Sequence, residues 1–125
     1  MNVPAELKYT SDHEWIRVEG DSATIGVTDY AQGELGDVVF VELPGVGEAF
    51  DQGDVAATIE AVKTVADVFL PLGGSIEAVN EALEDNSELI NQDAYGEGWI
   101  LKIKMSDPAE LDSCMSAEDY TSSIS

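Results

Sequence analysis

One lysine stands out among the residues that could do chemistry. The chain has 125 residues, of which 26 are acidic and only five are lysine or arginine. Lys63 lies in the middle of IEAVKTVADVFLP, residues 59–71, where its neighbours are apolar or acidic. Two interpretations compete: a solvated surface lysine, which is common in proteins, and an amine presented to another enzyme. The scarcity of lysine in this chain favours the second.

The segments on either side of Lys63 predict two β-strands joined by a tight turn. Residues 54–62, DVAATIEAV, and residues 64–71, TVADVFLP, both read with the period of two that is typical of strands. No long loop fits between them, so the turn is expected near Ala61 to Thr64. Lys63 would then lie at the tip of a hairpin, where it is flexible and within reach of a large enzyme.

The remaining pattern is mostly β. Strands are expected in HEWIRVEG, SATIGV, GDVVFVELPG and WILKIKM, which are bounded by turn residues. The continuous apolar character of GDVVFVELPG predicts a strand buried on both faces. Short strands at regular spacing indicate a sandwich or barrel-like fold.

Capping residues predict a few short helices. Thr28 as N-cap and Gly36 just beyond the end indicate one helix over TDYAQGEL. Asp107, which precedes a proline, and Ser116 indicate one or two further helices near the C-terminus.

Length and composition limit the class of protein. A chain of this size predicts a single domain over residues 1–125, with a helical extension over about 107–125. The N-terminal residues lack the apolar core of a secretory signal and the arginines of a transit peptide. No apolar run approaches the roughly 20 residues of a membrane helix, so a membrane partner is not expected.

The formal net charge of −21 is the extreme feature of the composition. It excludes nucleic acid and anionic membranes as partners, because binding them requires clustered lysine and arginine. The acids are dispersed along the chain. A docking surface for basic partners is one explanation, and adaptation to a high-salt cytoplasm, which we favour, is the other. The second predicts that stability rises with salt.

Other candidate sites are weak. His13 is the sole histidine, which excludes a multi-histidine metal site and favours a structural hydrogen-bonding role. Cys114 is the sole cysteine, so it has no partner for an intrachain disulfide or a redox pair. No nucleophile–base pair indicates an enzyme. The larger aromatic residues are expected in the core: Trp15, Phe40, Phe50, Phe69 and Trp99.

Several motifs in order carry a family resemblance. LKYTSDHEWIRVEGDSATIGVTDYAQGELGDVVFVELPGVG is followed by IEAVKTVADV, GGSIEAVNEAL, LINQDAYGEGW and ILKIK. Together they resemble the glycine cleavage system H protein family over most of the chain. Three positions depart from its common pattern: Ala61 replaces serine, and Glu88 and Ala94 replace proline. None of the three removes the lysine.

The resemblance implies a fold and a function. The fold would be mostly β, a lipoyl-domain-like barrel-sandwich hybrid of two antiparallel sheets with short helices in the N-terminal half and at the C-terminus. Lys63 would carry lipoate as lipoyl-lysine and shuttle the aminomethyl group of glycine. The protein would be a carrier rather than an enzyme, a monomer in a prokaryotic cytoplasm, or in the mitochondrial matrix if it is a mature organellar protein.

The resemblance also implies partners and a cleft. The partners would be glycine decarboxylase (P protein), aminomethyltransferase (T protein), dihydrolipoyl dehydrogenase (L protein) and a lipoate ligase or lipoyltransferase. The loaded group carries an amine, which an acidic cleft can hold. Glu14 and Asp67 match acidic family positions, and Asp12 is a third candidate.

Two alternative functions remain compatible with the sequence. Biotinyl carrier domains of carboxylases share a hairpin lysine, but theirs typically lies between methionines, whereas Val62 and Thr64 flank Lys63 here. A relay protein that donates lipoyl groups to other complexes would have the same sequence features as a carrier for glycine breakdown.

Overall fold

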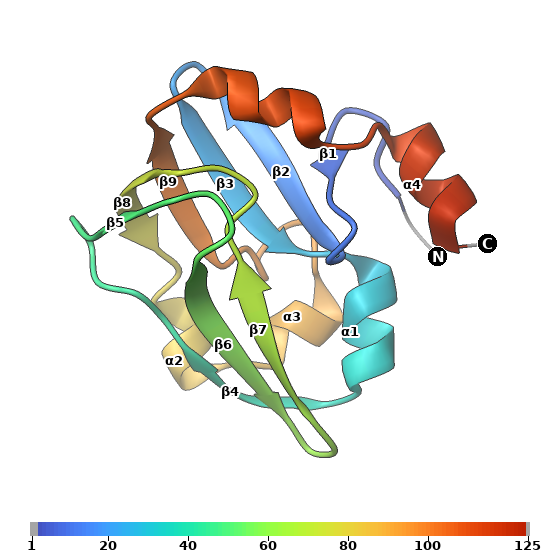
Figure 1. Cartoon of the computed structure of the whole chain (residues 1–125). Coiled ribbons are helices and arrows are strands. Elements are labelled where there is room, and N and C mark those ends of the chain that lie inside the picture. Colours follow the sequence, from blue (N-terminus) through green and yellow to red (C-terminus); the bar gives the residue numbers. More distant parts are fainter. Residues whose placement is uncertain (1–2, 125) are drawn as a thin grey trace.

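Two antiparallel sheets form the body of the protein. The computed structural model describes residues 3–124, and within them nine strands form the two sheets (Figure 1). The larger sheet has the order β1-β2-β3-β9-β8-β5 and the smaller sheet the order β4-β6-β7. The strands of the larger sheet are β1 (Lys8–Tyr9), β2 (Glu14–Glu19), β3 (Ser22–Val27), β5 (Ala49–Phe50), β8 (Gly74–Val79) and β9 (Leu101–Met105). The strands of the smaller sheet are β4 (Val38–Glu42), β6 (Val55–Ala61) and β7 (Val65–Phe69). The predicted fold class, mostly β with two antiparallel sheets, is confirmed.

Short helices connect and flank the sheets. They are α1 (Asp29–Leu35), α2 (Ala82–Asp85), α3 (Leu89–Gln92), a 3-10 helix (Pro108–Ser113) and α4 (Ala117–Ile124). The predicted caps are confirmed: side-chain oxygens of Thr28, Asp107 and Ser116 each accept a hydrogen bond from a backbone N–H of the first turn. The sequence pattern did not predict α2, because its one buried residue gives no helical period. Within residues 3–124, no helix is long and apolar enough to span a membrane.

The main core lies between the two sheets. It consists of side chains that point inward from both of them, among them Ile25, Val41, Ile59, Val68 and Ile103. A second, smaller cluster joins the two ends of the described chain, where Tyr9 of β1 stacks on Tyr120 of α4 with ring centroids 4.9 Å apart. The backbones of Tyr9 and Met115 are also hydrogen-bonded to each other. The C-terminal segment is therefore packed against β1, as Figure 1 shows.

The structure corrects two expectations about burial. β4 is not buried on both faces, since Val39 and Phe40 are 57% and 50% exposed. β4 is an edge strand with a bulge between Val38 and Phe40, and only the inner face of its sheet packs on the core. The expectation of core aromatics is correct for Trp15 but wrong for Phe40 and for Phe69, which points outward from β7.

Candidate functional site

Lys63 lies at the tip of the β6–β7 hairpin, as the strand pattern predicts. Ala61 N–H donates to the carbonyl of Thr64 over 2.8 Å, which closes the turn. Val62 N–H donates to the carbonyl of Asp37 over 3.0 Å, which ties the tip to the segment after α1. Lys63 is exposed, and Figure 1 shows the hairpin extending beyond the neighbouring elements. The turn thus fixes the backbone and leaves the amine accessible.

Gly36 lies beneath the side chain of Lys63. Its φ of +77° belongs to the left-handed region that suits glycine, and the residue ends α1. A Cβ at this position would lie 3.3 Å from Cε of Lys63, tighter than an ordinary contact. The glycine therefore serves both the helix end and the space that the lysine side chain occupies.

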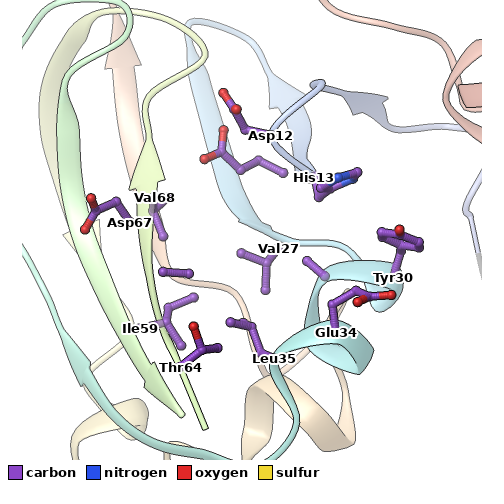
Figure 2. A pocket seen from close by; sticks show the side chains of 13 residues that line it. Asp12, His13, Val27, Tyr30, Glu34, Leu35, Ile59, Thr64, Asp67 and Val68 are labelled. Carbon is purple, nitrogen blue, oxygen red and sulfur yellow. The ribbon is translucent and has the colours of Figure 1, made fainter. Parts of the chain in front are cut away.

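A cleft of about 400 Å³ begins beside the hairpin tip. Its lining residues come from the turn before β2 and the start of β2, from β3, from α1 and from the β6–β7 hairpin: Asp12, His13, Glu14, Val27, Tyr30, Ala31, Glu34, Leu35, Ile59, Thr64, Ala66, Asp67 and Val68. Figure 2 shows Asp12 and His13 at one end, Leu35 and Thr64 at the other, and apolar side chains between them. Four of the lining residues are acidic and none is lysine or arginine. The cleft therefore suits an elongated, mainly apolar group that ends in a cation.

Glu14 is the buried acid of this cleft. Its side chain is 2% exposed, at the start of β2. Oε2 accepts a hydrogen bond of 2.7 Å from the backbone N–H of Phe69, and Oε1 accepts a longer one of 3.4 Å from the hydroxyl of Thr10. These contacts hold the carboxyl group between β2 and β7.

Burial raises the pKa of Glu14 to about 8. Removal of the carboxyl group from water is the largest cause, the nearby charge of Asp12 adds to it, and the hydrogen bonds from Phe69 and Thr10 act in the opposite direction. A buried acid with a perturbed pKa inside a cleft marks a candidate functional position. A cation that entered the cleft would favour the ionised form of Glu14.

The two other acids predicted for the site are exposed members of the cleft lining. Asp67 of β7 lies opposite Thr58 of β6, whose hydroxyl donates to Oδ1 of Asp67 over 3.4 Å. Asp12 lies in the turn before β2, near Glu14. The structure brings Asp12, Glu14 and Asp67 into one cleft, although the sequence separates the last from the others by more than fifty positions.

His13 and Tyr30 form a wall of the cleft that the sequence did not assign. The rings of His13 and Tyr30 lie 4.7 Å apart, and both line the cleft. His13 makes the expected structural hydrogen bond, with Nδ1 2.9 Å from the hydroxyl of Tyr120. Glu34 and Thr64 also line the cleft. No local sequence pattern marks these residues as part of a site, because the elements that carry them come together only when the chain folds.

Comparison with known proteins identifies close relatives over nearly the whole chain. The model of the family described as "Glycine cleavage H-protein" matches residues 7–125. The glycine cleavage system H protein of Bacteroides thetaiotaomicron is 57% identical over 120 residues, covering 96% of this chain and 95% of the relative. That of Halothermothrix orenii is 56% identical over 120 residues, covering 96% and 94%.

A solved structure has the same architecture. The crystal structure of a glycine cleavage system H protein from Mycobacterium marinum superposes with a TM-score of 0.89 at 36% sequence identity. The match covers 98% of both chains. The two sheets and the helices around them are therefore similar to those of a protein with the same family name.

Proposed function

The chain belongs to the glycine cleavage H-protein family, whose members are the lipoyl carriers of the glycine cleavage system, and we propose that Lys63 is its attachment residue. We further propose that the cleft beside Lys63 holds the loaded arm, meaning the lysine side chain with its attached group and cargo. The observation that carries both proposals is the position of an exposed lysine next to a cleft that contains a buried acid.

The residues present fit such an arm. Lys63 is exposed at a turn whose backbone is fixed, and Gly36 leaves room beneath its side chain. The neighbouring Thr64 lines the cleft, so the attachment point and the cleft are contiguous. Val27, Leu35 and Ile59 provide the apolar lining from the centre of the cleft to its end beside Thr64, as Figure 2 shows.

The chemistry divides between the attached group and this chain. When bound, the lipoyl group supplies a disulfide that accepts the aminomethyl group as its ring opens and is restored by thiol–disulfide exchange. In the cleft, the carboxylate of Glu14 is available to pair with a protonated amine, while Val27, Leu35 and Ile59 exclude water. Asp12 and Asp67 add negative charge to the exposed part of the cleft lining.

The protein itself acts as a tether rather than as a catalyst. A tethered group reaches each active site at a high effective concentration without further catalytic residues on the carrier.

Exposed apolar residues around Lys63 support docking by enzymes. Val62 is 74% exposed and Val65 is 59% exposed, and both are next to or close to Lys63 in the turn. Apolar side chains at a protruding tip favour burial against a partner. We assign as partners glycine decarboxylase, the aminomethyltransferase, dihydrolipoyl dehydrogenase, and the ligase or transferase that attaches lipoate.

Mass spectrometry tests the attachment residue. The intact mass of the protein purified from its own host, followed by peptide mapping, is expected to show a lipoyl increment on Lys63. A Lys63→Arg variant, which keeps the charge but cannot form the same amide, should lack the increment. A biotinyl increment would support the biotinyl carrier instead. An unmodified Lys63 in a host that lipoylates other proteins would overturn the proposal.

A further inference from the structure

The C-terminal helix α4 reaches the wall of the cleft through a single buried hydroxyl group. Tyr120 is fully buried, and its ring stacks on Tyr9. Its hydroxyl lies 2.9 Å from Nδ1 of His13 and 2.8 Å from Oγ1 of Thr28. The hydroxyl thus joins the turn before β2 to the start of α1, the two segments that meet at this wall of the cleft.

His13 belongs to the turn that leads into β2. It is the one non-glycine residue within 3–124 with a positive φ, at +66°, a conformation that side chains other than glycine rarely adopt. Such a conformation persists only where the surroundings hold it. Since Glu14 is the next residue, the backbone conformation of His13 helps to fix the position from which the Glu14 side chain enters the cleft.

Thr28 is the residue at the start of α1. Its Oγ1 caps the helix by accepting from Ala31 N–H over 3.2 Å, and its own N–H donates to the carbonyl of His13 over 3.0 Å. The helix that it caps contributes Tyr30, Glu34 and Leu35 to the cleft. A shift of Thr28 would therefore move the helical wall.

Two arrangements of protons satisfy this network. Either the hydroxyl of Thr28 donates to Tyr120 and the hydroxyl of Tyr120 donates to Nδ1 of His13, or Nδ1–H of His13 donates to Tyr120 and Tyr120 donates to Oγ1 of Thr28. In both, the hydroxyl of Tyr120 is bonded to His13 and to Thr28 at once. The three side chains form a continuous chain from α1 through α4 to the turn before Glu14.

We propose that Tyr120 is a positioning residue for the arm, holding His13 and Thr28 so that the cleft keeps Glu14 and the α1 wall in place. The proposal rests on the proposed function of the cleft as the site of the loaded arm. It gives the C-terminal helix a role in protecting the cargo, although α4 contributes no residue to the cleft lining.

The chain offers a matched pair of variants to test this. Tyr120→Phe and Tyr9→Phe each remove one hydroxyl from the same stacked pair of rings and leave both rings in place. The hydroxyl of Tyr9 donates to the carbonyl of Pro4 instead, outside the cleft. The measurement is the first-order loss of the aminomethyl group from lipoylated, loaded protein.

We expect Tyr120→Phe to shorten the lifetime of the loaded arm about threefold or more, which is the size of effect for one lost hydrogen bond. Tyr9→Phe should retain the lifetime of the unaltered protein, and lipoylation of Lys63 should proceed equally in all three. Equal lifetimes for the two variants would overturn the proposal. Glu14→Gln distinguishes failure of the Tyr120 proposal from failure of the proposed arm cleft. If Glu14→Gln shortens the lifetime and Tyr120→Phe does not, only the role of Tyr120 fails. If neither does, the proposed arm cleft fails as well.

A spectroscopic measurement tests the same hydrogen bond without dependence on loading. His13 is the sole histidine, so its ring nitrogens can be observed without ambiguity by 15N NMR in the unlipoylated protein. We expect the signal of an Nδ1 that is hydrogen-bonded, as acceptor or as donor, and that changes in Tyr120→Phe but not in Tyr9→Phe. An Nδ1 signal that is the same in the unaltered protein and in Tyr120→Phe would contradict the proposed hydrogen bond.

Discussion

Glu14 and Asn80 are both buried polar side chains, but their surroundings differ. Asn80, at the end of β8, is 6% exposed, and its Nδ2 donates to the carbonyls of Glu97 and Trp99 over 2.7 Å each. Its Oδ1 accepts from Ala82 N–H over 3.3 Å. The neutral amide is thus matched entirely by backbone groups of the same chain.

Glu14 is ionisable, and its surroundings provide hydrogen-bond donors but no positive charge from the cleft lining. It accepts from Phe69 N–H and from the hydroxyl of Thr10, and it faces a cleft without lysine or arginine in its lining. Burial raises its pKa rather than a cation lowering it. The comparison indicates that the amide of Asn80 is matched within the fold, whereas burial disfavours the charged form of Glu14, as expected if the proposed cargo supplies the missing positive charge.

Asn80→Ala tests the contribution of Asn80 to the stability of the fold. Asn80 itself is buried, and loss of its amide removes both hydrogen bonds to the carbonyls of Glu97 and Trp99, so we expect the free energy of unfolding to fall by about 2 kcal/mol. Urea denaturation measures this, with the exposed Asn86→Ala as a control expected to change it by less than about 0.5 kcal/mol. Equal losses for the two variants would remove Asn80 from the comparison.

The pH dependence of stability should distinguish Glu14 from Asn80. Because the pKa of Glu14 is raised to about 8 in the folded state, above its ordinary value of 4.5, the unfolded state binds fewer protons between these values. The effect of Glu14 on the free energy of unfolding should therefore be absent below about pH 4.5. It should become more destabilising as pH rises and reach its largest value above about pH 8.

Glu14→Gln should remove this contribution. Relative to the unaltered protein it should gain about 2 to 3 kcal/mol between pH 5 and pH 9, because one pKa unit is worth about 1.4 kcal/mol and the open cleft lets water offset part of the cost. Denaturation at a series of pH values provides the measurement. The curve of Asn80→Ala should run parallel to that of the unaltered protein, and a parallel curve for Glu14→Gln would contradict the account.

Two glycines, Gly33 within α1 and Gly36 directly after it, give a smaller and more local comparison. Gly36→Ala forces a side chain into a left-handed conformation and towards Cε of Lys63, so it should cost about 1 to 2 kcal/mol of stability and slow lipoylation. Gly33→Ala meets no atom within 4 Å and should stabilise the helix by about 0.5 to 1 kcal/mol. Thermal unfolding and the rate of lipoylation check both, and equal effects would argue against a special role for Gly36.

The sequence predicted local features better than contacts between distant segments. The hairpin around Lys63 and the caps at Thr28 and Ser116 were found because strand period and capping depend on neighbouring residues. The exposure of Phe40 was not, because an apolar run has the same pattern whether a strand is central or at an edge.

The site shows the same division. The acids at Glu14 and Asp67 came from the family resemblance, and the fold brings them to one cleft. The link between His13 and Tyr120 joins positions 107 residues apart, and no spacing rule connects them. Composition could not indicate which acid among 26 is buried, since burial depends on the packing of β2 against β7.

The most direct test of the account is the lifetime of the aminomethyl-loaded arm in Glu14→Gln. Lipoylated, loaded protein is followed at one pH and temperature, beside the unaltered protein and Glu42→Gln, which removes an exposed acid outside the cleft. We predict that Glu14→Gln loses its cargo about tenfold faster, as expected for a lost charge-assisted hydrogen bond, while Glu42→Gln does not. Equal lifetimes for all three would show that the buried acid does not hold the arm and would contradict the central claim.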